Sequence, residues 1–173
     1  DFDGAPQHAC AIIGDRDVTL LVTPEHAPPI NPSPWYAFRY EAAGNAPVGV
    51  TLRYLGGDHR YAPKLAAKAG EWREVPVETA ADGSSAVLRL PPGQGVVAAQ
   101  EIVTPDDAAA DLARWSAASG APVFTLGRSH DGRPIGAIRL GRADAPHLVI
   151  LLGRQHPPEV TGALAMTAFV DAL

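Results

Sequence analysis

The sequence predicts an antiparallel β-sandwich over residues 1–100, followed by a part in which strands and helices alternate. Short alternating or apolar segments separated by turn residues fill the first hundred positions, which is typical of a sandwich. A helix start signal near residue 104 opens a different pattern. The chain also holds 17 glycines and 17 prolines among 173 residues, and this high content favours many turns.

The strand candidates of the first part are short. Val48–Tyr54 shows the clearest alternation, with every second side chain on one face. Asn31-Pro-Ser-Pro34 predicts a turn or a rigid entry into the aromatic strand Trp35–Tyr40. We expect one pair of aromatic side chains of that strand in the core and the other at an edge or an interface, with a peptide-binding face as the alternative. The remaining candidates are 18–23, 71–77, 86–90 and 95–102.

The second part opens with a helix. Thr104 is a suitable N-cap, and Pro105 and two aspartates suit a first helical turn. The helix is expected through residues 108–119, with Leu112 and Trp115 as its buried contacts. Gly120 is a typical stop signal.

A hairpin, a strand and a second helix are predicted after Gly120. The hairpin pairs residues 123–129 with 135–140 around Asp131-Gly132. Leu148–Leu152 is apolar throughout, as in a central parallel strand, and residues 159–173 form the helix. Because this helix has no stop signal and the strand needs neighbours, we expect the chain to be the N-terminal part of a longer protein.

Composition narrows the classes of partner. The net charge is −5, with no basic patch, so we expect no nucleic-acid partner. No apolar run reaches the ~18 to 20 residues of a membrane-spanning helix. A single cysteine, Cys10, excludes an internal disulfide framework. The first residue is Asp1, and a removed signal peptide leaves no trace in the sequence, so the compartment stays open.

His156 and Glu159 form the candidate metal site. Both follow an apolar strand at its carboxyl end, where open α/β sheets bind ligands. Pro157 should keep His156 extended, and Pro158 suits the first helical position, so that Glu159 falls in the first turn. Imidazole and carboxylate are normal zinc ligands, but a catalytic zinc needs a third. The same spacing also fits a solvated histidine beside a glutamate that interacts only with the helix dipole.

Three segments in order resemble the zinc metallocarboxypeptidases, in particular their cytosolic-carboxypeptidase branch. His156-Pro-Pro-Glu159 looks like the first ligand pair of that family. Gly127-Arg-Ser-His-Asp-Gly-Arg-Pro-Ile135 resembles the family's "G-x-S-x-x-G-R-P-I" hairpin. Trp35-Tyr-Ala-Phe-Arg39 resembles the "W-F/Y-x-F-R" strand of the N-terminal β-sandwich in that branch.

This resemblance implies a β-sandwich over residues 1–100 and the beginning of an incomplete α/β zinc-carboxypeptidase domain over 101–173. It implies Zn²⁺ as the cofactor, His156 and Glu159 as metal ligands, and a peptide or protein C-terminal tail as the substrate. The family's third ligand, general base and substrate-carboxylate arginine lie further downstream, so this chain alone is expected to be inactive. The branch usually has glycine where Pro158 stands.

Several alternatives stay open. The chain could be a non-catalytic β-sandwich binding module, or an enzyme of the same fold that acts on an amide or an ester. Arg154 could approach a substrate carboxylate, but solvation or a local ion pair suits it equally. The other histidines, His8, His26, His59, His130 and His147, are expected at the surface or in turns. The family branch favours the cytoplasm, while a removed leader would indicate a periplasmic or secreted protein. The oligomeric state stays open.

Overall fold

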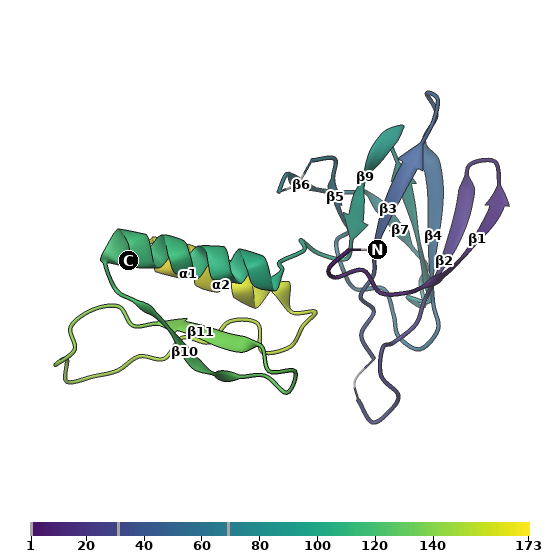
Figure 1. Ribbon diagram of the computed structural model, residues 1–173. Helices are drawn as coiled ribbons and strands as arrows, with labels where there is room; N and C mark the ends of the chain where they lie inside the picture. Colours follow the sequence, from purple (N-terminus) through teal and green to yellow (C-terminus); the bar gives the residue numbers. More distant parts are fainter. Residues whose placement is uncertain (1, 31, 69) are drawn as a thin grey trace. The chain divides into compact units, whose positions relative to one another are not determined.

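A computed structural model describes residues 2–30, 32–68 and 70–173 (Figure 1). The chain divides into two compact units, Asp1–Ile102 and Val103–Leu173. Asn31, which begins the predicted Asn31–Pro34 turn, lies outside the described residues. Neither helix of the described part has the length and apolar composition needed to cross a membrane.

Nine described strands form two sheets in the N-terminal unit (Figure 1). One sheet has the order β1-β2-β4-β8-β7 and the other the order β3-β9-β5-β6. The strands are β1 (Ala9–Gly14), β2 (Asp17–Val22), β3 (Ala37–Ala42), β4 (Val48–Tyr54), β5 (Lys64–Ala66), β6 (Trp72–Glu74), β7 (Val77–Thr79), β8 (Ser85–Leu90) and β9 (Gly93–Ala98).

Alternate side chains of both sheets build one hydrophobic core. β4 and β8 pair in register, and Leu52, Leu88 and Leu90 are completely buried. Leu65 of β5 and Val97 of β9 enter the same core from the other sheet. Burial of these side chains provides the main stabilisation of the unit, at about 1.5–3 kcal/mol for each large one.

The first sheet is not entirely antiparallel, so that part of the prediction is wrong. β2 and β4 pair in parallel, with Val18 opposite Val50 and Leu20 opposite Leu52. A parallel pair needs a crossover connection. Residues 23–47 supply it, because they pass through β3 in the other sheet before the chain returns as β4.

Some strands differ from those that the local sequence pattern predicts. The predicted strand 71–77 is two short strands, β6 and β7, which belong to different sheets. Pro76 cannot donate a ladder hydrogen bond, and Val75 donates its amide to the Pro63 carbonyl instead. β1 and β5 were not predicted. The predicted aromatic strand 35–40 corresponds to β3, which begins two residues later than predicted, at Ala37. Tyr36 is nevertheless fully buried, and Phe38 and Tyr40 pack against the core.

In the C-terminal unit, α1 (Pro105–Ser119) begins and ends as predicted. Thr104 accepts a hydrogen bond from the Asp107 amide, and the Asp107 side chain accepts one from the Thr104 amide, which completes a capping box. Gly120 ends the helix with φ 72°, a left-handed conformation that favours glycine. Trp115 is buried and Leu112 is half-buried.

The hairpin of the C-terminal unit consists of β10 (Val123–Arg128) and β11 (Pro134–Ile138), paired antiparallel as predicted. α2 (Val160–Asp171) is the last helix. The predicted strand Leu148–Leu152 is wrong, because these residues form no strand in the structure and their side chains are exposed. A strand requires ladder partners, and the described residues provide none for this segment.

A cluster of polar side chains links the two helices of this unit. The Asp171 carboxylate accepts hydrogen bonds from the Arg114 guanidinium and, at 2.7 Å, from the Trp115 indole. Asp111 accepts from Arg114 and from the Thr167 hydroxyl. The hydrogen bonds from Arg114 and Trp115 hold the pKa of Asp171 below its ordinary value, and the bond from Arg114 is the larger cause. The carboxylate therefore remains charged and keeps α1 and α2 together.

Candidate metal centre

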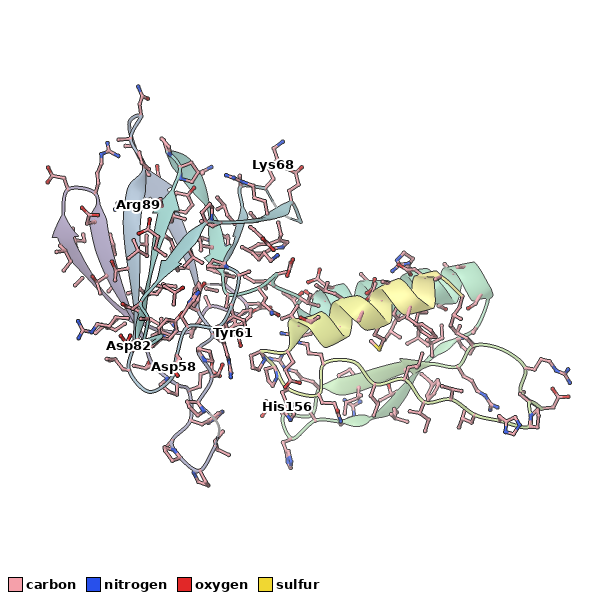
Figure 2. All side chains as sticks on the ribbon, turned by 180° about the vertical axis from the view of Figure 1, so that it is seen from behind. Asp58, Tyr61, Lys68, Asp82, Arg89 and His156 are labelled. Atoms are coloured by element: carbon pink, nitrogen blue, oxygen red, sulfur yellow. The ribbon has the colours of Figure 1, made fainter. Side chains whose placement is uncertain are left out.

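The candidate site lies on the loop that leads into α2, where Figure 2 labels His156. The Glu159 amide donates a 3.0 Å hydrogen bond to the His156 carbonyl, which closes a turn through Pro157 and Pro158. α2 then begins at Val160, with Glu159 as its N-cap. The expectation that Pro158 is the first helical residue is therefore wrong. The two prolines form the centre of the turn, and the helix starts two residues later.

The turn brings the two predicted ligand side chains together. His156 Nδ1 lies 2.9 Å from Glu159 Oε2. Both side chains are exposed, at 70% and 61%. The nitrogen and the oxygen that face each other are the atoms that bind zinc in proteins. The arrangement is therefore open to solvent and accessible to a cation.

The donor set fits part of a zinc site. One imidazole and one carboxylate are suitable ligands, but a catalytic zinc takes three protein ligands. Within residues 2–30, 32–68 and 70–173, no group of three or more histidine, cysteine, aspartate or glutamate side chains is placed to hold a metal. His156 and Glu159 could thus supply two of the ligands and no more.

The Arg154 side chain forms hydrogen bonds that stabilise this loop. Its Nε–H donates to the Pro157 carbonyl at 2.9 Å, and its Nη1–H donates to the Val103 carbonyl. It is the single non-glycine residue with positive φ, 52°, in the described part of the chain. Partial burial lowers the pKa of Arg154, although an arginine stays protonated in proteins. Its guanidinium therefore binds two backbone carbonyls in the structure.

Two glycines allow the loop to lie close to α2. A Cβ on Gly153 would stand 3.0 Å from the Gly162 carbonyl oxygen and 3.0 Å from Met166 Sδ. A Cβ on Gly162 would stand 3.1 Å from the Arg154 amide nitrogen. Any side chain at either position would push the loop and the first turns of the helix apart.

The other histidines are exposed or bonded to residues of their own unit. His26, His130 and His147 are exposed, as predicted. His8 and His59 are half-buried in loops: His8 bonds to the Trp35 carbonyl, and His59 Nδ1 lies 2.9 Å from the Tyr54 hydroxyl. Burial lowers the pKa of both His8 and His59. These two are structural residues of the N-terminal unit.

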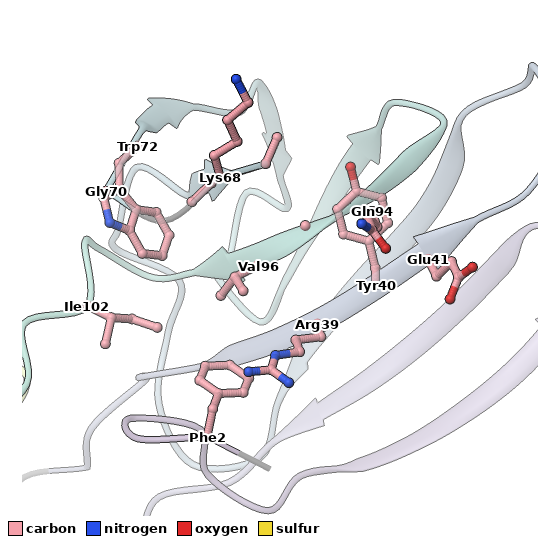
Figure 3. A pocket seen from close by; sticks show the side chains of 13 residues that line it. Phe2, Arg39, Tyr40, Glu41, Lys68, Gly70, Trp72, Gln94, Val96 and Ile102 are labelled. Atoms are coloured by element: carbon pink, nitrogen blue, oxygen red, sulfur yellow. The ribbon is translucent and has the colours of Figure 1, made fainter.

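The N-terminal unit carries a hollow of about 500 Å³ that sequence reasoning missed (Figure 3). Arg39, Val96, Ala66 and Trp72 stand in one row across the four strands of the second sheet. This row faces away from the core residues, since side chains alternate along a strand. The Arg39 guanidinium lies over the Phe2 ring, 4.9 Å from its centroid. In the sequence, the polar residues Arg39 and Glu41 at alternate positions of β3 could have indicated this exposed face.

Comparison with solved structures finds metallo-carboxypeptidases. A metallo-carboxypeptidase from Pseudomonas aeruginosa, in complex with (2-guanidinoethylmercapto)succinic acid, matches with a TM-score of 0.72 and 21% identity over 99% of this chain. One from Burkholderia cenocepacia matches with a TM-score of 0.67 and 21% identity over 85%. A protein from Burkholderia mallei, also named as a carboxypeptidase, matches with a TM-score of 0.81 and 21% identity over 98%.

The TM-scores establish a shared fold. The chain spans 40%, 45% and 47% of the length of the Burkholderia cenocepacia, Burkholderia mallei and Pseudomonas aeruginosa structures, respectively. No protein-family model matches the sequence, and no curated protein sequence matches it either. The chain therefore has a β-rich mixed fold of the carboxypeptidase type, and the matches do not favour the alternative of a non-catalytic binding module.

Proposed function

We propose that this chain contributes to a zinc-dependent carboxypeptidase that hydrolyses C-terminal peptide bonds of peptides or protein tails. The observation that carries the proposal is the 2.9 Å approach of His156 Nδ1 to Glu159 Oε2 in a chain with the carboxypeptidase fold. Residues 1–100 would be the β-sandwich, and residues 101–173 the beginning of the α/β peptidase domain. The division after Ile102 supports these boundaries.

His156 and Glu159 would provide two ligands of the zinc ion. When bound, such an ion would supply Lewis-acid chemistry toward a scissile carbonyl and a water molecule. This chain's part is to hold a neutral imidazole nitrogen and a carboxylate oxygen side by side on a closed turn.

The aromatic segment Trp35–Tyr40 supports a place in the cytosolic-carboxypeptidase branch, although that branch usually has glycine where Pro158 stands. Tyr36 is fully buried, and Phe38 packs against the same core. We propose that this segment anchors the sandwich and that it is not a peptide-binding face, because most of its aromatic surface is used in packing.

Calorimetric titration of the purified chain with ZnCl₂ tests the metal assignment. His156→Ala and Glu159→Ala should each weaken zinc binding by at least about tenfold, since loss of a group that merely supports a ligand already costs about 10–100-fold. His130→Ala is the matched control, because His130 is an exposed histidine of the same unit. Unchanged zinc affinity in both ligand variants would overturn the assignment.

A peptidase assay of the same chain tests the second part of the proposal. With two ligands in place of three, the chain alone should not hydrolyse a peptide. Release of a C-terminal residue by the purified wild-type chain, abolished in Glu159→Ala, would contradict this expectation and would show that the site is complete.

A further inference from the structure

The loop that carries His156 and Glu159 has one side chain that bonds both to the turn and to a segment outside the loop. Arg154 donates to the Pro157 carbonyl, which stands between the two candidate ligands. It also donates to the Val103 carbonyl, 51 residues earlier in the chain. Val103 directly precedes Thr104, whose capping box fixes the start of α1. The guanidinium therefore connects the turn to a fixed point of the unit.

The backbone at Arg154 indicates that this connection is specified. A positive φ is uncommon for a residue other than glycine, and asparagine or aspartate are the usual exceptions. An arginine in this conformation is retained only where the surrounding contacts determine it. Here the contacts are the two carbonyls and the tight approach of Gly162 to the Arg154 amide.

We propose that Arg154 is a positioning residue for the metal site, which clamps the Pro157 and Val103 carbonyls so that His156 Nδ1 and Glu159 Oε2 face each other. This inference rests on the proposed function. The planar guanidinium suits the task because it presents several donors in a fixed fork, whereas a lysine ammonium is a single point. The two hydrogen bonds of Arg154 go to backbone carbonyls and not to the candidate ligand side chains, so its effect passes through the backbone of the turn.

Two substitutions separate the guanidinium from the backbone conformation. Arg154→Lys keeps the charge but cannot reproduce the fork. Arg154→Gly accepts the positive φ without strain but removes both donors. Arg139→Lys is the matched control, because the Arg139 guanidinium also donates to a backbone carbonyl, that of Ala143, in an exposed loop of the same unit.

The first measurement is the zinc affinity of the full chain. Arg154→Lys and Arg154→Gly should each weaken it about tenfold, the lower end of the effect of residues that orient metal ligands, and Arg139→Lys should leave it unchanged. The thermal unfolding midpoint of Arg154→Lys should stay at the wild-type value, which separates positioning from general stability. Wild-type affinity in either Arg154 variant would overturn the proposal.

The second measurement does not depend on metal. The Glu159 amide, which bonds to the His156 carbonyl, should exchange its hydrogen about tenfold faster in both Arg154 variants, since a released turn exposes it to water. If the wild-type chain binds no zinc through His156 and Glu159, the proposed function fails, and this exchange rate still decides the role of Arg154. Wild-type exchange in either variant would show that Arg154 does not hold the turn.

Discussion

The two units of the chain differ in where they keep their large hydrophobic side chains. In the N-terminal unit these residues fill a core that both sheets share, and four of the described ones are exposed: Ile12, Ile13, Ile30 and Leu55. In the C-terminal unit, Trp115 and Val160 are the buried hydrophobic residues of the described part. The exposed ones there are Val123, Phe124, Leu126, Ile135, Leu140, residues 148–152, Leu164, Phe169 and Leu173.

Within the described residues, the two units therefore differ in how much apolar surface they bury. The N-terminal unit is stabilised mainly by apolar burial, which is not directional and grows with area. In the described part of the C-terminal unit, directional polar contacts such as the Asp171 cluster and the capping box of α1 accompany a smaller apolar core. The candidate metal site lies in the unit with the smaller core, where a few hydrogen bonds decide the geometry.

The same substitution in both units gives the largest expected difference. Leu88→Ala removes a fully buried side chain from β8 and should cost about 2–5 kcal/mol of the free energy of unfolding. Leu148→Ala removes a side chain that is 71% exposed and should change stability by less than about 0.5 kcal/mol. Urea unfolding followed through assigned amide NMR signals of each unit measures both. Equal losses of unfolding free energy for the two variants would contradict the proposed difference between the units.

Two strand glycines provide the next contrast. A Cβ on Gly95 would stand 2.9 Å from the Ala66 carbonyl oxygen, and backbone cannot move aside. Gly95→Ala should therefore destabilise the N-terminal unit by about 1–3 kcal/mol. A Cβ on Gly136 would meet the end of the flexible Leu112 side chain at 2.7 Å. Gly136→Ala should cost less than about 0.5 kcal/mol in the same assay. A larger loss at Gly136 would mean that the C-terminal unit is as tightly packed.

Thr104→Ala tests how much a polar contact contributes to the stability of the C-terminal unit. The substitution removes the side-chain acceptor of the Asp107 amide and should cost the C-terminal unit about 1 kcal/mol. Hydrogen exchange of the amides in the first turn of α1 measures the loss. Thr104→Ser keeps the hydroxyl and serves as the control. Equally protected amides in the alanine variant would show that the capping box is not needed.

The smallest effect is expected from pH. The folded pKa of Asp171 lies below its unfolded value of about 3.9. Its stabilisation is therefore complete above the unfolded pKa and is lost as the pH falls through the folded pKa. The urea midpoint of the C-terminal unit should decrease below about pH 4 in the wild type and respond less to pH in Asp171→Asn. Asp131→Asn, in the exposed hairpin turn, is the control. Identical acid profiles in wild type and Asp171→Asn would contradict this role.

Short-range signals made much of the fold predictable. Thr104 and Gly120 act within a few residues of themselves, so the sequence predicts both ends of α1 correctly. β4 is predicted to the residue because its alternation matches one buried face. Leu148–Leu152 shows the limit. Apolar composition predicts a preference for burial, but a strand also needs ladder partners that a local pattern cannot identify.

The candidate site likewise has one contact that the sequence predicts and one that it does not. The proximity of His156 and Glu159 follows from a turn that closes over three residues, and the two prolines predict it. The contact between Arg154 and Val103 spans 51 positions. No periodicity or spacing rule connects residues so far apart, so the clamp becomes visible only in the folded structure.

The Asp171 cluster has a consequence for the order in which the protein forms during synthesis. Trp115 and Arg114 emerge from the ribosome more than 50 residues before Asp171, their partner on α2. The pairing strands of the two N-terminal sheets are all synthesised by Ala98. The N-terminal unit can therefore fold first, as domains generally do during translation, whereas Arg114 and Trp115 can bond to Asp171 only after α2 has been synthesised.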